Sequence, residues 1–206
     1  VSSSSPAVAA RCAHARAGVG AVASQNITDP SLGTRALDLM ALGARAPEAI
    51  TILRETAPHV EYRQLTAVDP SGQTAVHHGE RVLGIHSHAE THGAIAAGNI
   101  LSSQAVPQAM IAAFEATPGH LGDRLIAAMR AAVAAGGEEG PVHSAGIKLV
   151  DNVPWPVADL RVDWSDDCPI ERLAALWDLY KPQLADYVTR ALNPAAAPSY
   201  GVPGDE

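Results

Sequence analysis

Aromatic residues are scarce in this sequence. They make up 4% of its 206 residues, with a single phenylalanine, although hydrophobic residues reach 47%. A core built from this composition must pack Ala, Val, Leu and Ile closely, with little help from aromatic rings. Lysine occurs only at Lys148 and Lys181, and the formal net charge is −8. Without a run of basic residues, the chain is not expected to bind nucleic acid or an anionic membrane surface.

Cysteine and long apolar runs are also lacking. Two cysteines, Cys12 and Cys168, are too few for a disulfide framework, which fits a reducing, cytoplasmic location. No apolar run reaches the roughly 18–20 residues needed to span a bilayer. Residues 1–23 lack the charged start and the unbroken apolar core of a secretory signal. The length predicts one domain, over residues 1–193, followed by an extended Pro- and Gly-rich arm over 194–206.

Hydrophobic periodicity predicts strands and helices in an irregular order. The expected strands are 1–4, 18–25, 62–68, 73–78, 93–101, 144–150 and 159–164. The expected helices are 32–42, 47–56, 105–116, 121–135 and 170–193, the last interrupted at Pro182. Strands and helices that do not alternate strictly favour an α+β fold, with two sheets covered by helices on the outside.

Several sequence stretches resemble a known family. They are the run SSSSPAVAARCAHARAGVGAVASQNITDPSLG near the start, Gly98-Asn99, LGDRLIAAMRAAVAAGG, the HSA at residues 143–145 and DLRVDW at 159–164. In this order they resemble the domain of unknown function 1028 family, bacterial proteins with an Ntn-hydrolase-like fold. The resemblance implies an αββα sandwich of two mainly antiparallel sheets. Family members usually begin with a short strand of the type Thr-Phe-Ser-Ile, which this sequence does not contain.

The resemblance implies an enzyme whose first residue is its nucleophile. An Ntn hydrolase uses an initial Thr, Ser or Cys, and the free α-amine of that residue acts as the base. Val1 has no nucleophilic atom. We therefore expect the nucleophile to lie upstream of Val1 and the sequence to be a fragment. The expected reaction is hydrolysis of a small amide without a cofactor. The alternative is a non-catalytic binding or assembly protein of the same fold.

The same analogy places seven supporting side chains near the nucleophile or its substrate: Ser3, Ser4, Arg11, His14, Gln25, Asn26 and Asn99. The serine hydroxyls would border the nucleophile, and Arg11 or His14 would supply a cation that lowers its pKa. The three amides would hold a substrate or stabilise an oxyanion.

Histidine provides a competing signal. Five of the nine histidines fall between His77 and His92, and the spacing of His86, His88 and His92 suits zinc ligation, with Glu90 among them. The run departs from the H-x-H-x-D-H pattern because it carries Glu90 and an additional Thr91. A zinc hydrolase on these three histidines is therefore a further hypothesis, and a histidine-rich polar loop is the simpler interpretation.

Two other expectations concern Cys12 and self-association. Arg11, His14 and Arg16 could stabilise a Cys12 thiolate as a nucleophile, although a small buried side chain is the commoner role of such a cysteine. Ser, His and Asp are all available, but no G-x-S-x-G motif supports a catalytic triad. A homodimer formed through helices or the C-terminal arm is also expected.

Overall fold

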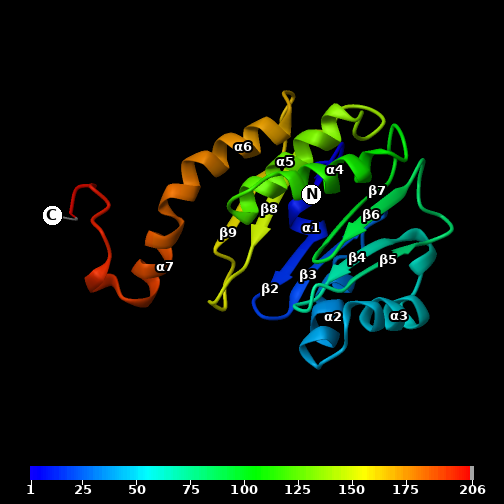
Figure 1. Ribbon diagram of the computed structural model, residues 1–206, viewed down its shortest axis with the longest axis horizontal. Helices are drawn as coiled ribbons and strands as arrows, with labels where there is room; N and C mark the ends of the chain where they lie inside the picture. Colours follow the sequence, from blue (N-terminus) through cyan, green and yellow to red (C-terminus); the bar gives the residue numbers. More distant parts are fainter. Residues whose placement is uncertain (205–206) are drawn as a thin grey trace.

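The structure is a computed structural model that describes residues 1–204. Its first layer is an antiparallel sheet in the order β2-β3-β4-β5. These strands are β2 (Ala13–Arg16), β3 (Gly20–Gln25), β4 (Gln64–Val68) and β5 (Thr74–His78). Helices α2 (Pro30–Ala41) and α3 (Ala46–Thr56) pack on the outer face of this sheet (Figure 1). The predicted hairpin at residues 62–78 is present, with a 3-10 turn, η1 (Val60–Tyr62), before it.

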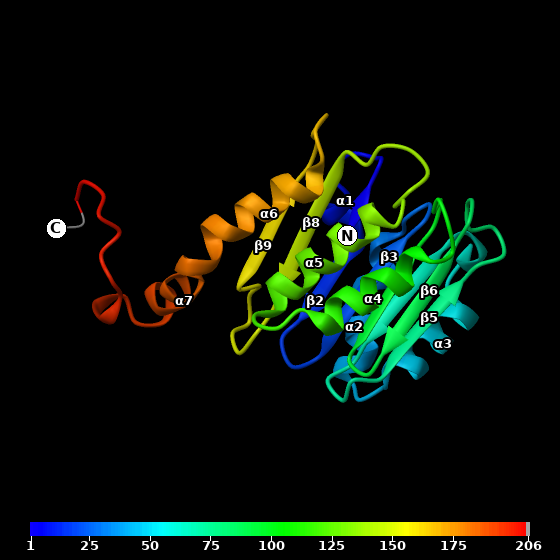
Figure 2. The same cartoon turned by 45° about the horizontal axis from the view of Figure 1, so that its top comes forward.

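The second layer consists of two separate antiparallel sheets. One pairs β6 (Ser87–Thr91) with β7 (Ala94–Gly98), and the other has the order β1-β8-β9. Its strands are β1 (Ser2–Ser3), β8 (Ser144–Leu149) and β9 (Ala158–Val162). The covering helices are α4 (Val106–Ala116), α5 (Leu121–Ala134) and α6 (Pro169–Tyr180). Helix α4 packs on β6 and β7, whereas α5 and α6 pack on β8 (Figure 2).

Side-chain alternation on β8 shows how the layers stack. Ala145, Ile147 and Leu149 belong to the apolar cluster that includes residues of α6. On the opposite face of β8, Gly146 lies against Ala9, and the Lys148 ammonium donates to the Ala13 carbonyl at 3.3 Å. The order of layers is helices, sheet, sheet, helices, which confirms the predicted α+β sandwich of antiparallel sheets.

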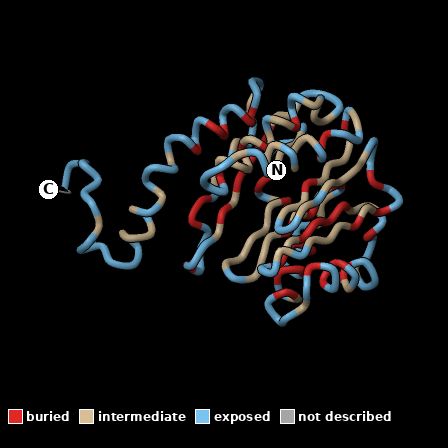
Figure 3. Tube along the Cα trace, in the orientation of Figure 1, coloured by how far each residue is buried: buried red, intermediate tan, exposed pale blue. Residues whose placement is uncertain are grey.

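A helical arm leaves this sandwich at the C-terminal side. Helix α6 continues through a 3-10 turn, η2 (Lys181–Gln183), into α7 (Leu184–Leu192) and a second short turn, η3 (Pro194–Ala196). Pro182 thus interrupts the helix as predicted. Figure 3 shows α7 and the chain after it as mostly exposed. The last two residues of the predicted arm, 205 and 206, lie outside the described residues.

Two sequence predictions are wrong near functional candidates. Between the predicted strands 1–4 and 18–25, where no element was expected, lies a helix, α1 (Val8–Cys12), followed directly by β2. This helix starts after Ala7, whose φ of 54° is left-handed, a conformation for which alanine gives no sequence signal. The histidine-rich stretch is not a loop, because residues 87–91 form β6 despite their polarity. Among the described helices, none is long and apolar enough to cross a membrane.

Candidate functional site

A cavity of about 860 Å³ lies between the two layers. Its walls come from β1, β2, β3, β7 and β8, and from α4 and α5. Strands β2 and β3 contribute several alanines together with His14 and Gln25, whereas α4 and α5 contribute large apolar side chains such as Met110 and Phe114. Cavities of this size and mixed character are typical of ligand sites. All seven supporting residues predicted from the sequence are among those that line it.

The serine-rich segment after β1 forms one part of the cavity rim. Ser5 N donates to Ser3 Oγ at 3.1 Å, and the hydroxyls of Ser3 and Ser5 are 2.9 Å apart. The backbone N–H of Ser4 donates to the Glu138 carboxylate at 3.2 Å, and the Ser4 hydroxyl donates to the same carboxylate. Glu138 therefore ties the serines to the end of α5 across 134 residues of sequence.

Arg11 shapes the same turn from α1. Its guanidinium donates to Ser5 Oγ at 2.9 Å, to the Ala7 carbonyl at 3.1 Å and to the Pro6 carbonyl. These hydrogen bonds hold the serine turn in place. The Arg11 guanidinium that donates them carries a positive charge and also borders the cavity. From β8, the buried Ser144 hydroxyl donates to the Ser5 carbonyl at 2.6 Å. The serine turn is thus held by hydrogen bonds from Arg11 of α1 and from Ser144 of β8.

The predicted amides form a second cluster where β3 and β7 end. Asn26 is buried, and its Oδ1 accepts from Leu83 N at 3.0 Å and from Asn99 Nδ2 at 3.1 Å. Its Nδ2 donates to the Tyr62 carbonyl. Asn26 adopts a left-handed φ of 58°, which asparagine tolerates better than most residues. These bonds make Asn26 the residue that holds Asn99 at the cavity.

Gln25 begins a chain of polar contacts that leads away from the cavity. Its Nε2 donates to Gln64 Oε1 and to the Ala97 carbonyl at 3.3 Å. Gln64, which is fully buried, donates to the Gly98 carbonyl at 2.9 Å and to His78 Nδ1 at 2.8 Å. Both glutamines therefore join the first layer to β7 in the second.

His14 does not point where the analogy requires. It borders the cavity through β2, but its ring packs on α2, where an added Cβ at Gly33 would lie 2.2 Å from His14 Cδ2. Its Nε2 donates to the Arg11 carbonyl at 3.1 Å. Burial lowers the pKa of His14, with a smaller opposing contribution from that backbone bond and a further lowering by Lys148. The ring therefore packs against α2, and its lowered pKa disfavours the cation that the analogy assigns to it.

Comparison with known proteins gives the family of the chain. The model of a family of unknown function, DUF1028, matches residues 1–173. The chain belongs to the DUF1028 family. A crystal structure of the DUF1028 protein SPO2555 from Silicibacter pomeroyi is similar, with a TM-score of 0.82 and 28% sequence identity. The similarity covers 90% of this chain and 84% of that one. A search of curated proteins finds no match.

The zinc triad predicted from sequence is not assembled in this DUF1028 chain. His92 lies against Gly72, whereas the rings of His86 and His88 lie 5.1 and 5.2 Å from the ring of His78. Among residues 1–204, no group of three or more His, Cys, Asp or Glu has the geometry to hold a metal ion. The triad is not formed because β6 ends at Thr91, so His88 lies within the strand whereas His92 lies beyond it, before β7, and contacts Gly72.

His78 is instead the end of the polar chain that starts at Gln25. Because the Gln64 amide donates to its Nδ1, His78 Nε2 carries the proton and donates to His88 Nδ1 at 3.1 Å. Burial, together with the nearby imidazoles of His88, His86 and His77, lowers the pKa of His78 to about 4. This ring is neutral at neutral pH.

Sequence reasoning did not identify Glu138, Ser144 or Gln64 as site residues. Glu138 follows Gly136-Gly137, which end the helix, so the sequence indicated that it lies in a loop. The sequence did not indicate that Glu138 would contact Ser4. Ser144 stood in the HSA motif without an assigned role.

Cys12 is buried at 3% exposure, and its Sγ lies 3.5 Å from the Thr28 hydroxyl, consistent with a packing role.

Proposed function

We propose that this chain supplies the substrate-binding and positioning part of an Ntn-type amidohydrolase that cleaves a small amide. The observation that carries the proposal is the convergence of the serine turn, Arg11 and the Asn26–Asn99 pair on one cavity. Positioned amide N–H groups and a fixed guanidinium are the donors that suit a developing oxyanion.

The proposed reaction needs a nucleophile that Val1 cannot supply, because its side chain has no nucleophilic atom. A Thr, Ser or Cys encoded before Val1 would add its oxygen or sulfur to the amide carbonyl while its own α-amine takes the proton. Collapse of the tetrahedral intermediate breaks the C–N bond, and the amine leaves with that proton. Water then hydrolyses the acyl-enzyme and releases the acid. No cofactor takes part in these steps.

The decisive experiment uses the protein expressed from its full natural reading frame. Intact-mass spectrometry and N-terminal sequencing would identify its first residue. We expect Thr, Ser or Cys there, release of amine from small amides, and loss of turnover when that residue is changed to Ala. A mature protein that begins at Val1, or turnover that survives the substitution, would contradict the proposal. Binding of small amides without turnover would favour a non-catalytic binding protein.

We also propose that the protein is a cytoplasmic homodimer whose contact includes the C-terminal arm. The location is supported by two free cysteines, one buried and one exposed. The dimer is supported by exposed apolar side chains near the ends of α6 and α7, the helices that lead to the arm, with Leu179 at 67% and Leu192 at 64% exposure. The family match ends at residue 173, before most of the arm. Light scattering on the whole chain and on a chain that ends at Gln183 would test this, because only the whole chain should dimerise.

A further inference from the structure

Two ring-bearing side chains that have no part in the proposed function meet in the structure. His143 belongs to the HSA motif, and Trp164 ends the DLRVDW motif. Their rings are stacked, with centroids 4.2 Å apart and an interplanar angle of 10°. His143 Nδ1 donates to the Ser165 carbonyl at 2.9 Å, and Ser165 N donates to the His143 carbonyl at 2.8 Å. Two hydrogen bonds thus join the segments that carry the stacked rings.

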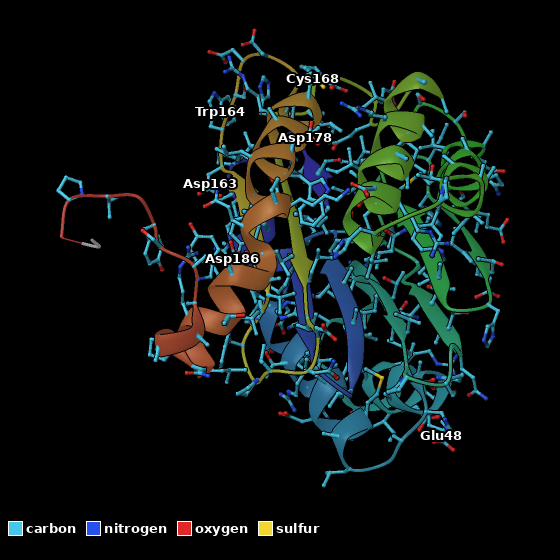
Figure 4. All side chains as sticks on the ribbon, turned by 60° about the vertical axis from the view of Figure 1, so that its left-hand side comes forward. Glu48, Asp163, Trp164, Cys168, Asp178 and Asp186 are labelled. Atoms are coloured by element: carbon cyan, nitrogen blue, oxygen red, sulfur yellow. The ribbon has the colours of Figure 1, made fainter. Side chains whose placement is uncertain are left out.

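The stack lies beside the serine turn and the cavity. His143 N donates to the Ser3 carbonyl at 2.9 Å, so the stack and the serine turn are connected directly. Val142, next to His143, and Asp166, two residues after Trp164, both line the cavity. Figure 4 shows Trp164 at the outside of the molecule. A molecule bound at this edge of the cavity can therefore contact the indole.

The indole of Trp164 is exposed and yet fixed in position. Its exposed fraction is 52%. Single exposed apolar side chains are common in proteins, but this one is held on one face by His143 and at its edge by Asp166, whose Oδ1 accepts from Trp164 Nε1 at 3.2 Å. A side chain that is already fixed loses little conformational freedom when a ligand binds. The face turned away from His143 is therefore a preformed surface for a flat or charged group.

The charges around the indole favour a cation. The face of an indole ring attracts positive charge, and tryptophan does so more strongly than the other aromatic residues. Among residues 1–204, Asp166 takes part in no ion pair, and its Oδ2 has no hydrogen-bond partner. The next acid, Asp167, already pairs with Arg172. A carboxylate without a counter-charge therefore lies at the edge of an open indole face.

We propose that the indole of Trp164 and the carboxylate of Asp166 form a subsite for a guanidinium or ammonium group of the molecule that occupies the cavity. The cation stacks on the indole face opposite His143 and pairs with Asp166 Oδ2. This inference rests on the proposed function, which makes the cavity the substrate site, and it narrows the substrate class to small amides that carry a positive charge.

Nuclear magnetic resonance of the 206-residue chain, with argininamide as the probe, tests the subsite. The indole N–H signals of the three tryptophans report separately, and Trp155→Phe and Trp164→Phe assign them. We expect the Trp164 signal to move. Trp155, exposed between β8 and β9, and Trp177, buried, are internal controls whose signals should stay in place. Citrullinamide, which has an uncharged urea of the same shape in place of the guanidinium, should bind about tenfold more weakly.

Matched variants test the two groups that hold the cation, with binding followed through the signals of argininamide itself. Trp164→Ala should abolish binding, whereas Trp155→Ala should not change it. Asp166→Asn keeps an acceptor for Trp164 Nε1 but removes the charge, so it should weaken binding about fivefold. Asp178→Asn, an exposed acid on α6 that forms no ion pair among the described residues, should have no effect. All four side chains are exposed, so these variants should fold.

Three outcomes would overturn the subsite: an unmoved Trp164 signal, unchanged binding in Trp164→Ala, or equal affinity for argininamide and citrullinamide. Equal affinity would mean that the indole takes a flat group whatever its charge. The assay measures binding without turnover, so failure of the proposed hydrolysis would leave the binding of argininamide intact. Failure of the subsite would instead leave intact any hydrolysis of uncharged amides by the protein from the full reading frame.

Discussion

Asn99 Nδ2 donates a hydrogen bond of 3.1 Å to Asn26 Oδ1, joining the end of β7 in one layer to the end of β3 in the other. Asn26 itself is fixed by Leu83 N and by the Tyr62 carbonyl. Asn26 therefore holds the Asn99 side chain in place where both residues line the cavity. Substitution of Asn26 should therefore lower the free energy of unfolding more than substitution of Asn99.

Asn26→Ala is expected to lower the free energy of unfolding by about 3 kcal/mol, because the Leu83 N–H and the Tyr62 carbonyl would lose their partner in a buried site. The left-handed φ of 58° adds to the cost for alanine. Asn99→Ala should cost only about 1 kcal/mol, because it removes a single bond. Urea unfolding of both variants would measure the difference. Equal losses would show that Asn26 does not organise this end of the cavity.

Gly33 and His14 should be coupled. Gly33→Ala would normally stabilise a helix by up to about 1 kcal/mol, but the new Cβ would lie 2.2 Å from the His14 ring. We expect it to destabilise the protein by about 1–3 kcal/mol, the range typical of overpacking. In a His14→Ala background the same substitution should be neutral or stabilising. A double-mutant cycle in urea that shows additivity would contradict the packing of His14 on α2.

His78 should make stability depend on pH between 6.5 and about 4. The pKa of the folded state is lower than that of the unfolded state, so the unfolded state binds more protons in this range and stability falls as the pH falls. The rings of His86 and His88 lie beside this ring, and His77 precedes it on β5. Because the ring is only partly buried, we expect a loss of about 1 kcal/mol, which His78→Gln should remove. His59→Gln, at an exposed position, is the matched control, and an unchanged pH profile in His78→Gln would contradict the prediction.

Much of the fold could be predicted from the sequence, because helix starts, helix ends and hairpin turns are marked by neighbouring residues. Pro47 marks the start of α3, Gly136-Gly137 follows the end of α5, and Asp69-Pro70 marks the turn of the β4–β5 hairpin. Helix α1 escaped prediction because it has five residues and starts from a left-handed alanine. Strand β6 escaped because its residues, Ser87–Thr91, show no apolar alternation.

The candidate site could be predicted only in part, since its residues meet through contacts distant in sequence. Ser4 and Glu138 illustrate this, because nothing local to either residue indicates the other. His14 was expected on a connector between strands, but it lies in β2, and its ring packs against Gly33 of α2. The resemblance selected residues that line one cavity, and only coordinates show which of them point into it.

Figure 4 shows Asp163, Asp178 and Asp186 on the side of the molecule where α6 and α7 lie. A carboxylate with a different role, Asp123, fastens the arm to the sandwich. Its Oδ1 accepts from Trp177 Nε1 at 2.8 Å, and its Oδ2 pairs with Lys181 Nζ at 2.6 Å. Trp177 is 1% exposed, so its indole N–H has little access to water.

Asp123→Ala is therefore expected to lower the free energy of unfolding by about 1–3 kcal/mol, mainly because the buried Trp177 N–H loses its acceptor. The matched control is Glu171→Ala, which breaks the Arg130–Glu171 pair between the same two helices. Both side chains of that pair are more than half exposed, at 52% and 56%, so the cost should stay below about 1 kcal/mol.

Hydrogen bonds from Lys181 and Trp177 lower the pKa of Asp123. Its contribution is thus complete above the ordinary carboxyl pKa and is lost as the pH falls through the lowered value. Urea unfolding at neutral and acidic pH would measure both effects, and equal losses for the two variants would show that the arm is not fastened through Asp123.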